Sequence, residues 1–286
     1  MGISLKNKPP YNSFDEHVAS LEAAAELIPS GIGTFIDAEC RSGYIGANAD
    51  ARRVIFMDTN QLFIALLYLM ATADPEDIIA GIVDIEQQMG LDSSDVGKAK
   101  LAFELLAYRY SEEGEVLDAL TAALNSTSRR IISSTNSMLW EFSPNNLVRT
   151  DLALQNRIIN YSNRLHGIDA LFKPKPYRYL NFNKFTERDF LFLRLSPFTA
   201  TNKYYFVKKK QTRRTNLEYK SLRLAVRSGI GIGAIGFYKI GEERNLELEH
   251  LIDDYPEFIM TRIPYSAIQN RNDQHMEYVY LSNRHA

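Results

Sequence analysis

Apolar residues recur at helical spacing through much of the first half of the chain. Residues 14–28 combine Ala, Leu and Glu at this spacing and end before Pro29 and Gly31. Similar patterns follow in LFIALLYLMA, in EDIIAGIVDIEQQM behind Asp74 and Pro75, in GKAKLAFELLAYRY, in GEVLDALTAAL and in LALQNRIINYSNRL. The pattern therefore predicts a mainly helical first part.

Other apolar runs are too short for helices and have the composition of strands. Residues 33–38 and 53–57 are bounded by Gly, Ser, Asn and Asp, which suits two buried strands, each ending on or beside an aspartate. From Tyr177 onward, aromatic and β-branched residues alternate with polar ones in DFLFLRLS, KYYFVKKK and MEYVYLS. We expect an α+β fold, with a mostly helical part over 1–173 packed with a strand-rich part over 174–286.

Composition adds the expectation of a substantial core in an intracellular protein. The 286 residues are 45% hydrophobic, which is enough for one large domain or two small ones. The single cysteine, Cys40, has no partner for a disulfide or a thiolate zinc site. The longest apolar stretch, 62–71, is about half of the ~20 residues that a membrane span needs. We expect a soluble protein without a membrane partner, in the cytoplasm of a cell or host cell.

Charge divides the chain more sharply than its net value of -2 suggests. Residues 1–150 carry 21 acidic and 11 basic residues, whereas residues 151–286 carry 14 acidic and 22 basic ones. An acidic first part and a basic second part could pack through complementary faces, within one molecule or between copies.

The steepest basic run lies between residues 203 and 227, where we expect a hairpin or loop. Tyrosine and phenylalanine are interleaved with the cations there, so the run could neutralise phosphates and stack on unpaired bases. The predicted contacts to nucleic acid or another polyanion are Lys203, Lys208, Lys209, Lys210, Arg213, Arg214, Lys220, Arg223 and Arg227.

These features favour a non-enzymatic structural or assembly protein of virion or nucleoprotein type. Such a protein would contact nucleic acid or form a homo-oligomer or larger assembly through its acidic and basic faces. The chain has no closely spaced histidines and no nucleophile elbow. This interpretation therefore assigns no catalytic residue, no metal site and no cofactor.

The stretch VIFMDTNQLFIALL over residues 54–67 supports an alternative. It resembles the opening of PIN-like nucleases, in which Asp-Thr-Asn follows the first strand. The resemblance implies an enzyme dependent on Mg²⁺ or Mn²⁺, which activates water against a phosphodiester. Its metal ligands would be Asp58, Glu141, Asp169 and Asp189. Asp58 and Gln61 also fit a capping box that starts a helix and needs no metal.

Two further motifs have competing interpretations. FIDAEC carries Asp37 and Glu39, which resemble the first motif of DEDD-type exonucleases or else form a solvated strand face. GIGAIG, over residues 231–236, has the letters of a dinucleotide-binding loop. Because its glycines alternate with isoleucines, a strand with one bare face is favoured, and that face could accept a closely packed neighbour.

Overall fold

The structure is a computed structural model that describes residues 2–10, 18–58, 61–88, 152–195, 220–240, 243–263 and 276–284. Its helical segments are α1 (Val18–Ala25), α2 (Tyr44–Asn48), α3 (Gln61–Thr72), α4 (Pro75–Gln88), α8 (Leu152–His166), the 3-10 turns η1 (Tyr177–Tyr179) and η2 (Phe182–Lys184), a helix over 220–227, and α10 (Leu246–Asp254). Its strands are β1 (Ile32–Ala38), β2 (Ala51–Met57), β3 (Ala170–Lys173), β4 (Phe190–Arg194), β5 (Gly231–Ile240), β6 (Glu243–Arg244), β7 (Ile259–Ile263) and β8 (Met276–Ser282).

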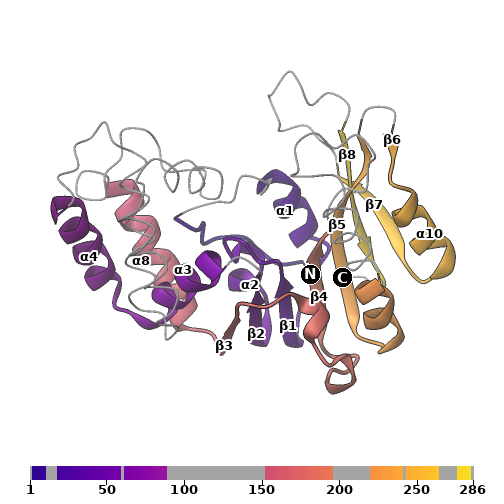
Figure 1. Cartoon of the computed structure of the whole chain (residues 1–286), viewed down its shortest axis with the longest axis horizontal. Helices are drawn as coiled ribbons and strands as arrows, with labels where there is room; N and C mark the ends of the chain where they lie inside the picture. The colour runs from indigo at the N-terminus through magenta and orange to yellow at the C-terminus, as the bar shows by residue number, and fades with distance from the viewer. Residues whose placement is uncertain are drawn as a thin grey trace, which may run out of the picture.

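One mixed sheet organises the described part of the chain (Figure 1). Its strand order is β3-β2-β1-β4-β5-β8-β7, and β6 pairs with β5 at the side. The five strands β3, β2, β1, β4 and β5 are mutually parallel, whereas β8 is antiparallel to both of its neighbours. From β1 the chain first adds strands on one side, β2 and β3, and then on the other, β4 and β5. The order therefore reverses between β1 and β4.

Both faces of the sheet are buried, which explains the continuous apolar runs in the parallel strands. Phe35 and Phe56 belong to one core cluster, and Ile36 and Ile55 belong to the other, because neighbouring residues of a strand point to opposite faces. Helices α1, α3 and α8 cover the first face. The helix over 220–227, α10 and the two 3-10 turns cover the second. In Figure 1, α3, α4 and α8 lie together beyond β3, and α10 lies at the opposite side.

Local sequence signals explain where two of the helices begin. The Asp74 side chain accepts a hydrogen bond from the Glu76 backbone N–H at 2.8 Å, and Pro75 opens α4, where a missing N–H is harmless. The Asn245 side chain accepts from the Leu248 N–H at the start of α10. Within α8, Ile158, Tyr161 and Leu165 are buried at helical spacing.

Several predicted elements are confirmed. Strands occur at 32–38, 51–57, 190–194 and 276–282, and helices occur at 18–25, 61–72, 75–88 and 152–166. GIGAIG lies in β5 as a strand, and a Cβ on Gly233 would lie 2.3 Å from the Tyr280 hydroxyl and 2.8 Å from Phe190. The bare face therefore accepts closely packed aromatic neighbours.

The expected mixture of helices and strands is confirmed, but the arrangement of the two parts differs from a simple side-by-side packing. Strands from both sides of Pro174 join the same sheet, because β4 and β5 extend the sheet begun by β1 and β2. The division at 173 and 174 and the separation of acidic from basic faces stay predictions, since residues 89–151 and 196–219 lie outside the described part of the chain.

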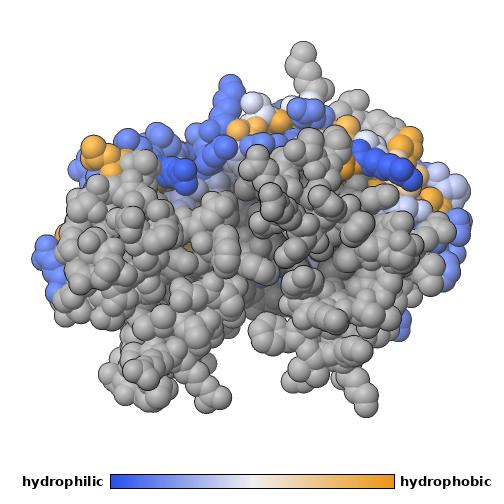
Figure 2. Space-filling view, turned by 90° about the horizontal axis from the view of Figure 1, so that it is seen from above, coloured by the Kyte–Doolittle hydropathy of each residue, from blue (hydrophilic) through white to orange (hydrophobic). Residues whose placement is uncertain are grey.

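The described surface is mixed in character. On the coloured part of the face shown in Figure 2, hydrophilic residues predominate and hydrophobic ones are interspersed among them. The large exposed hydrophobic residues come from separate elements and are Leu152, Leu171, Tyr179, Leu224 and Ile259. Among the helices in the described ranges, none is both long enough and apolar enough to cross a membrane.

Candidate functional site

The carboxyl ends of β1, β2 and β4 form the candidate site. In open sheets of parallel strands, ligands bind outside these ends, at the point where the strand order reverses. Here that point lies between β1 and β4. Asp37 is the second-last residue of β1, Asp58 directly follows β2, and Arg194 ends β4. All three side chains are at most 12% exposed, so the sheet brings buried charges to this edge.

The loop after β1 has an unusual backbone. Glu39 and Arg41 have φ of 55° and 54°, and Gly43 has φ of 71°. Positive φ is uncommon for residues that carry a Cβ. Gly43 is required also by packing, because a Cβ there would lie 2.8 Å from the Leu67 side chain and 3.0 Å from Phe56. The loop therefore turns tightly against β2 and α3.

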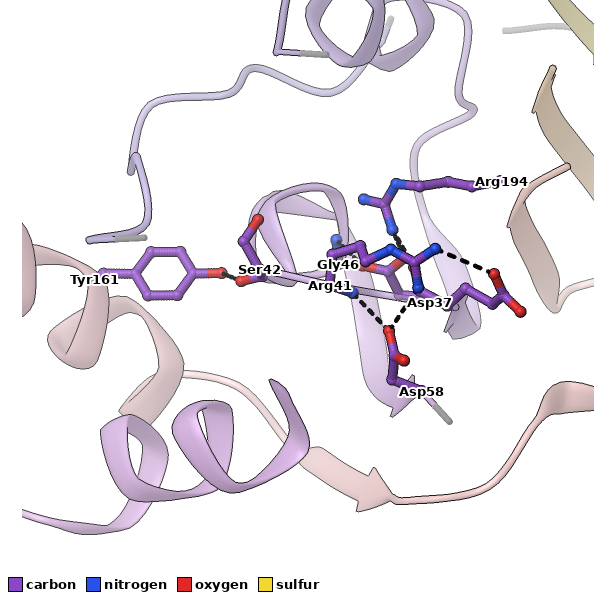
Figure 3. A network of polar contacts seen from close by, with 8 residues as sticks. Asp37, Arg41, Ser42, Gly46, Asp58, Tyr161 and Arg194 are labelled. Carbon is purple, nitrogen blue, oxygen red and sulfur yellow. Dashed lines mark hydrogen bonds and ion pairs between the residues drawn. The ribbon is translucent and has the colours of Figure 1, made fainter. Parts of the chain in front are cut away.

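Arg41 holds two of the carboxylates (Figure 3). Its Nη1 lies 3.2 Å from Asp58 Oδ2, and its backbone N–H donates to the same oxygen at 3.0 Å. Its Nη2 lies 3.4 Å from Glu39 Oε2. The Glu39 side chain is only 4% exposed, so Asp37 and Glu39 do not form the solvated strand face that was one expectation. Buried charges of this kind are retained only when they are paired.

Arg194 pairs with the third carboxylate. Its Nη1 lies 3.6 Å from Asp37 Oδ1 and donates to the Glu39 carbonyl oxygen. The other oxygen of Asp37 accepts from the Gly46 backbone N–H at 3.0 Å. A Cβ on Gly46 would lie 2.9 Å from that oxygen, so only glycine lets the start of α2 approach the carboxylate this closely.

Helix α8 fixes the far side of the same loop. The Tyr161 hydroxyl donates to the Ser42 carbonyl oxygen at 2.7 Å (Figure 3). The Arg164 guanidinium donates to the carbonyl oxygens of Ala47 and Ala49, at 2.6 Å and 3.4 Å. Because α8 lies more than a hundred residues further along the chain, the loop geometry depends on tertiary packing.

Cys40 lies within the loop and is fully buried. Burial is the largest cause that raises the pKa of its thiol, and the charges of Asp58 and Asp37 raise the pKa further. A thiol with a raised pKa stays protonated and is a poor nucleophile at neutral pH. Cys40 therefore belongs to the apolar packing of the loop.

The predicted nuclease ligands do not meet in the described structure. Asp58 lies at the carboxyl end of β2, whereas Asp169 and Asp189 precede β3 and β4 and lie at the amino ends. With a rise of about 3.3 Å per residue, the five residues from Arg53 to Asp58 separate these edges by roughly 16 Å. Glu141 lies outside the described residues. Among the residues that are described, no three His, Cys, Asp or Glu side chains form a group able to hold a metal ion.

Three of the nine predicted nucleic-acid contacts lie in the described part of the chain. Lys220 and Arg227 are exposed on the helix over 220–227, and Arg223 pairs with Asp254 at 3.5 Å. The predicted contacts Lys203, Lys208, Lys209, Lys210, Arg213 and Arg214 lie outside it.

Sequence reasoning missed Arg41, Arg194 and the glycine loop. The signal was present, because RSGYIG begins three residues after the end of the strand that contains Asp37. A glycine loop between a strand and a helix is the sequence context of nucleotide-binding turns. GIGAIG matches the letters of the dinucleotide-binding loop more closely but lies in β5.

Comparison with known proteins gives two related matches. The chain is 23% identical to the modification methylase StsI of Streptococcus sanguinis over 199 residues, which are 69% of this chain and 30% of the methylase. It is 22% identical to the type II methyltransferase M.FokI of Planomicrobium okeanokoites over 193 residues, which are 65% of this chain and 28% of that enzyme. The chain thus spans less than a third of the length of these relatives. No family model matches it.

These matches bear on three expectations. Both similar proteins are methyltransferases, so the prediction of a non-enzymatic structural protein of viral or nucleoprotein type is wrong, and an enzyme is indicated instead. The alternative of a Mg²⁺- or Mn²⁺-dependent PIN-like nuclease gains no support from them. The expectation of no cofactor is also contradicted, because the two similar proteins are methyltransferases, and enzymes of that kind take the methyl group from a donor.

Proposed function

We propose that this chain contains the donor-binding unit of a DNA methyltransferase that uses S-adenosylmethionine. The observation that carries the proposal is the similarity to two methyltransferases over about two thirds of the chain. The strand order supports it, because the reversal between β1 and β4 lies where open parallel sheets bind nucleotide-like ligands.

The residues at the carboxyl edge fit such a donor. In nucleotide-binding sheets, an acidic residue about 20 positions after the first turn accepts hydrogen bonds from ribose hydroxyls. Asp58 follows β2 and lies 15 residues beyond Gly43. S-adenosylmethionine contains a ribose, so Asp58 is the proposed acceptor of its hydroxyl groups. The donor carries its methyl group on a positively charged sulfur, and this edge has three carboxylates against two guanidinium groups.

The basic run supplies the proposed contacts to DNA. Strand β4 ends at Arg194 on the same edge as Asp58, and the basic residues follow it in the chain. Clustered cations of this kind neutralise the phosphates of a polyanionic substrate such as DNA. Of the described members of the run, Lys220 and Arg227 are exposed. Self-association through acidic and basic faces stays a prediction.

The donor site is tested by calorimetric binding of S-adenosylhomocysteine, which has the donor's ribose but no transferable methyl group. We expect the full chain to bind it, and Asp58→Asn to weaken binding at least about tenfold, because one good hydrogen bond to a charged group contributes about 1.5–3 kcal/mol. Arg53→Ala is the matched control, since Arg53 pairs with Asp169 at the amino half of β2. Absence of binding by the folded wild-type chain would refute the proposal.

The DNA contact is tested by binding to a duplex across a salt series. Replacing Lys208, Lys209, Lys210, Arg213 and Arg214 by Ala should lower affinity and reduce the salt slope by about one for each lost phosphate contact. Transfer of radioactive methyl groups from the donor to DNA is measured in parallel. An unchanged affinity and slope would remove this run from the proposed DNA contact.

A further inference from the structure

Arg41 occupies a backbone position that is better suited to glycine. Its φ is 54°, in the left-handed region, which glycine enters freely and a residue with a Cβ enters at a cost. Backbone outliers of this kind persist only where their surroundings impose them, and they cluster at functional sites. An arginine at this position therefore indicates a role other than forming the turn.

This role involves the carboxylate of Asp58, which the Arg41 guanidinium contacts. Asp58 Oδ2 lies 3.2 Å from Arg41 Nη1, in a pair whose side chains are 0% and 13% exposed. This carboxylate is the group assigned above to the ribose of the donor. A ribose hydroxyl and the guanidinium both donate hydrogen bonds, and both would donate to the same carboxylate, of which Arg41 already occupies Oδ2.

We propose that Arg41 is a built-in competitor of the donor at Asp58, an inference that rests on the proposed donor site. With the guanidinium on Asp58 the site is closed, and a ligand that carries a ribose diol opens it by taking the place of the guanidinium. Apparent affinity is then the intrinsic affinity multiplied by the fraction of molecules in which the site is open.

Glu39 makes the exchange physically feasible. A buried guanidinium that lost its only partner would be strongly destabilised. Glu39 Oε2 already lies 3.4 Å from Arg41 Nη2, so the cation keeps a carboxylate partner after it leaves Asp58. The backbone N–H of Arg41, which donates to Asp58 at 3.0 Å, need not move. The exchange therefore requires only a rotation of the Arg41 side chain.

The test compares binding of S-adenosylhomocysteine by wild type and by Arg41→Gly, in the full chain, by titration calorimetry. The glycine suits the positive φ and keeps the backbone N–H. We expect it to bind about tenfold more tightly, which corresponds to a site that is open in roughly one wild-type molecule in ten. Arg41→Gly should also bind adenosine more tightly than wild type does. It should bind 2′,3′-dideoxyadenosine no more tightly, because only the diol competes with Arg41.

Controls separate this inference from the proposed function. Arg53→Ala removes an arginine from an ion pair at the other edge and should leave the affinity unchanged. If circular dichroism shows that Arg41→Gly does not fold, the double variant with Glu39→Gln is measured instead. The second substitution relieves repulsion between the carboxylates of Glu39 and Asp58. Equal or weaker binding by the variant, with binding by wild type, overturns the role of Arg41 and leaves the donor site intact. No binding by any folded form overturns both.

Discussion

Buried carboxylates have different partners at the two edges of the sheet. At the amino edge, Asp189 accepts hydrogen bonds at 2.7 Å from the backbone N–H groups of Thr34 and Thr186. At the carboxyl edge, Asp37 and Asp58 each accept one backbone N–H and also face a guanidinium group. Both arrangements satisfy buried oxygens, but only the second brings five charged side chains together.

The difference separates a structural role from a functional one. A carboxylate held by backbone N–H groups ties strand ends together and cannot be released without unfolding them locally. A carboxylate held by an arginine side chain can exchange that partner for a ligand. Buried ion pairs add little stability compared with apolar packing, so their presence at the edge where the strand order reverses supports a binding role there.

The largest expected effect comes from breaking the carboxyl-edge network at Arg194. Arg194→Met removes the guanidinium that lies 3.6 Å from the fully buried carboxylate of Asp37. We expect the free energy of unfolding to fall by about 3–5 kcal/mol at pH 7, measured by urea denaturation. Adding Asp37→Asn should recover part of this loss, because the amide is neutral. A loss below about 1 kcal/mol would show that the pair is not needed to hold the edge.

At the amino edge, Asp189→Ala should cost about 2–3 kcal/mol. The substitution leaves the N–H groups of Thr34 and Thr186 without their acceptor, and an unsatisfied buried donor costs about 1–3 kcal/mol. Binding of S-adenosylhomocysteine, measured below the midpoint of denaturation, should remain unchanged. Weaker binding by this variant would contradict the separation of roles between the edges.

The pH dependence of stability tests how well the loop excludes water from the Cys40 thiol. Since burial raises the pKa of the folded-state thiol, the folded chain keeps a proton that the unfolded chain loses above about pH 8.5. Stability is therefore full below that pH, and falls above it by up to about 1.4 kcal/mol per pH unit. Urea denaturation from pH 7 to 10 measures the slope, and Cys40→Ala should reduce it. An equal slope in the variant would assign the effect elsewhere, for example to Tyr280, whose pKa is also raised by burial.

The smallest effect is expected for the exposed pair at the amino edge. Arg53 and Asp169 lie 2.7 Å apart, but both side chains are 50% exposed. Solvent screens such pairs, so Arg53→Ala should change the free energy of unfolding by less than about 1 kcal/mol. A double-mutant cycle with Asp169→Ala measures the coupling. A coupling as large as the loss in Arg194→Met would remove the contrast between exposed and buried pairs.

Much of the local structure could be predicted from the sequence. The apolar runs of β1, β2 and β4 predicted strands because both of their faces are buried, and the Asp74-Pro75 step predicted the start of α4. The position of Asp58 at the end of a strand was also predicted, although its partner was not. The resemblance to nucleases was wrong because fourteen residues around one aspartate cannot say which other side chains share its edge.

The sequence by itself determined the elements, the strand-end aspartates and the division of charge, since these depend on residues that are close together in the chain. Only the tertiary structure decided that β1 lies between β2 and β4, and so that Arg194 reaches Asp37 across 157 positions. It also decided the left-handed backbone of Glu39 and Arg41, which local propensity disfavours. Long-range strand pairing and packing against α8 impose that conformation, and neither is encoded in any short stretch of sequence.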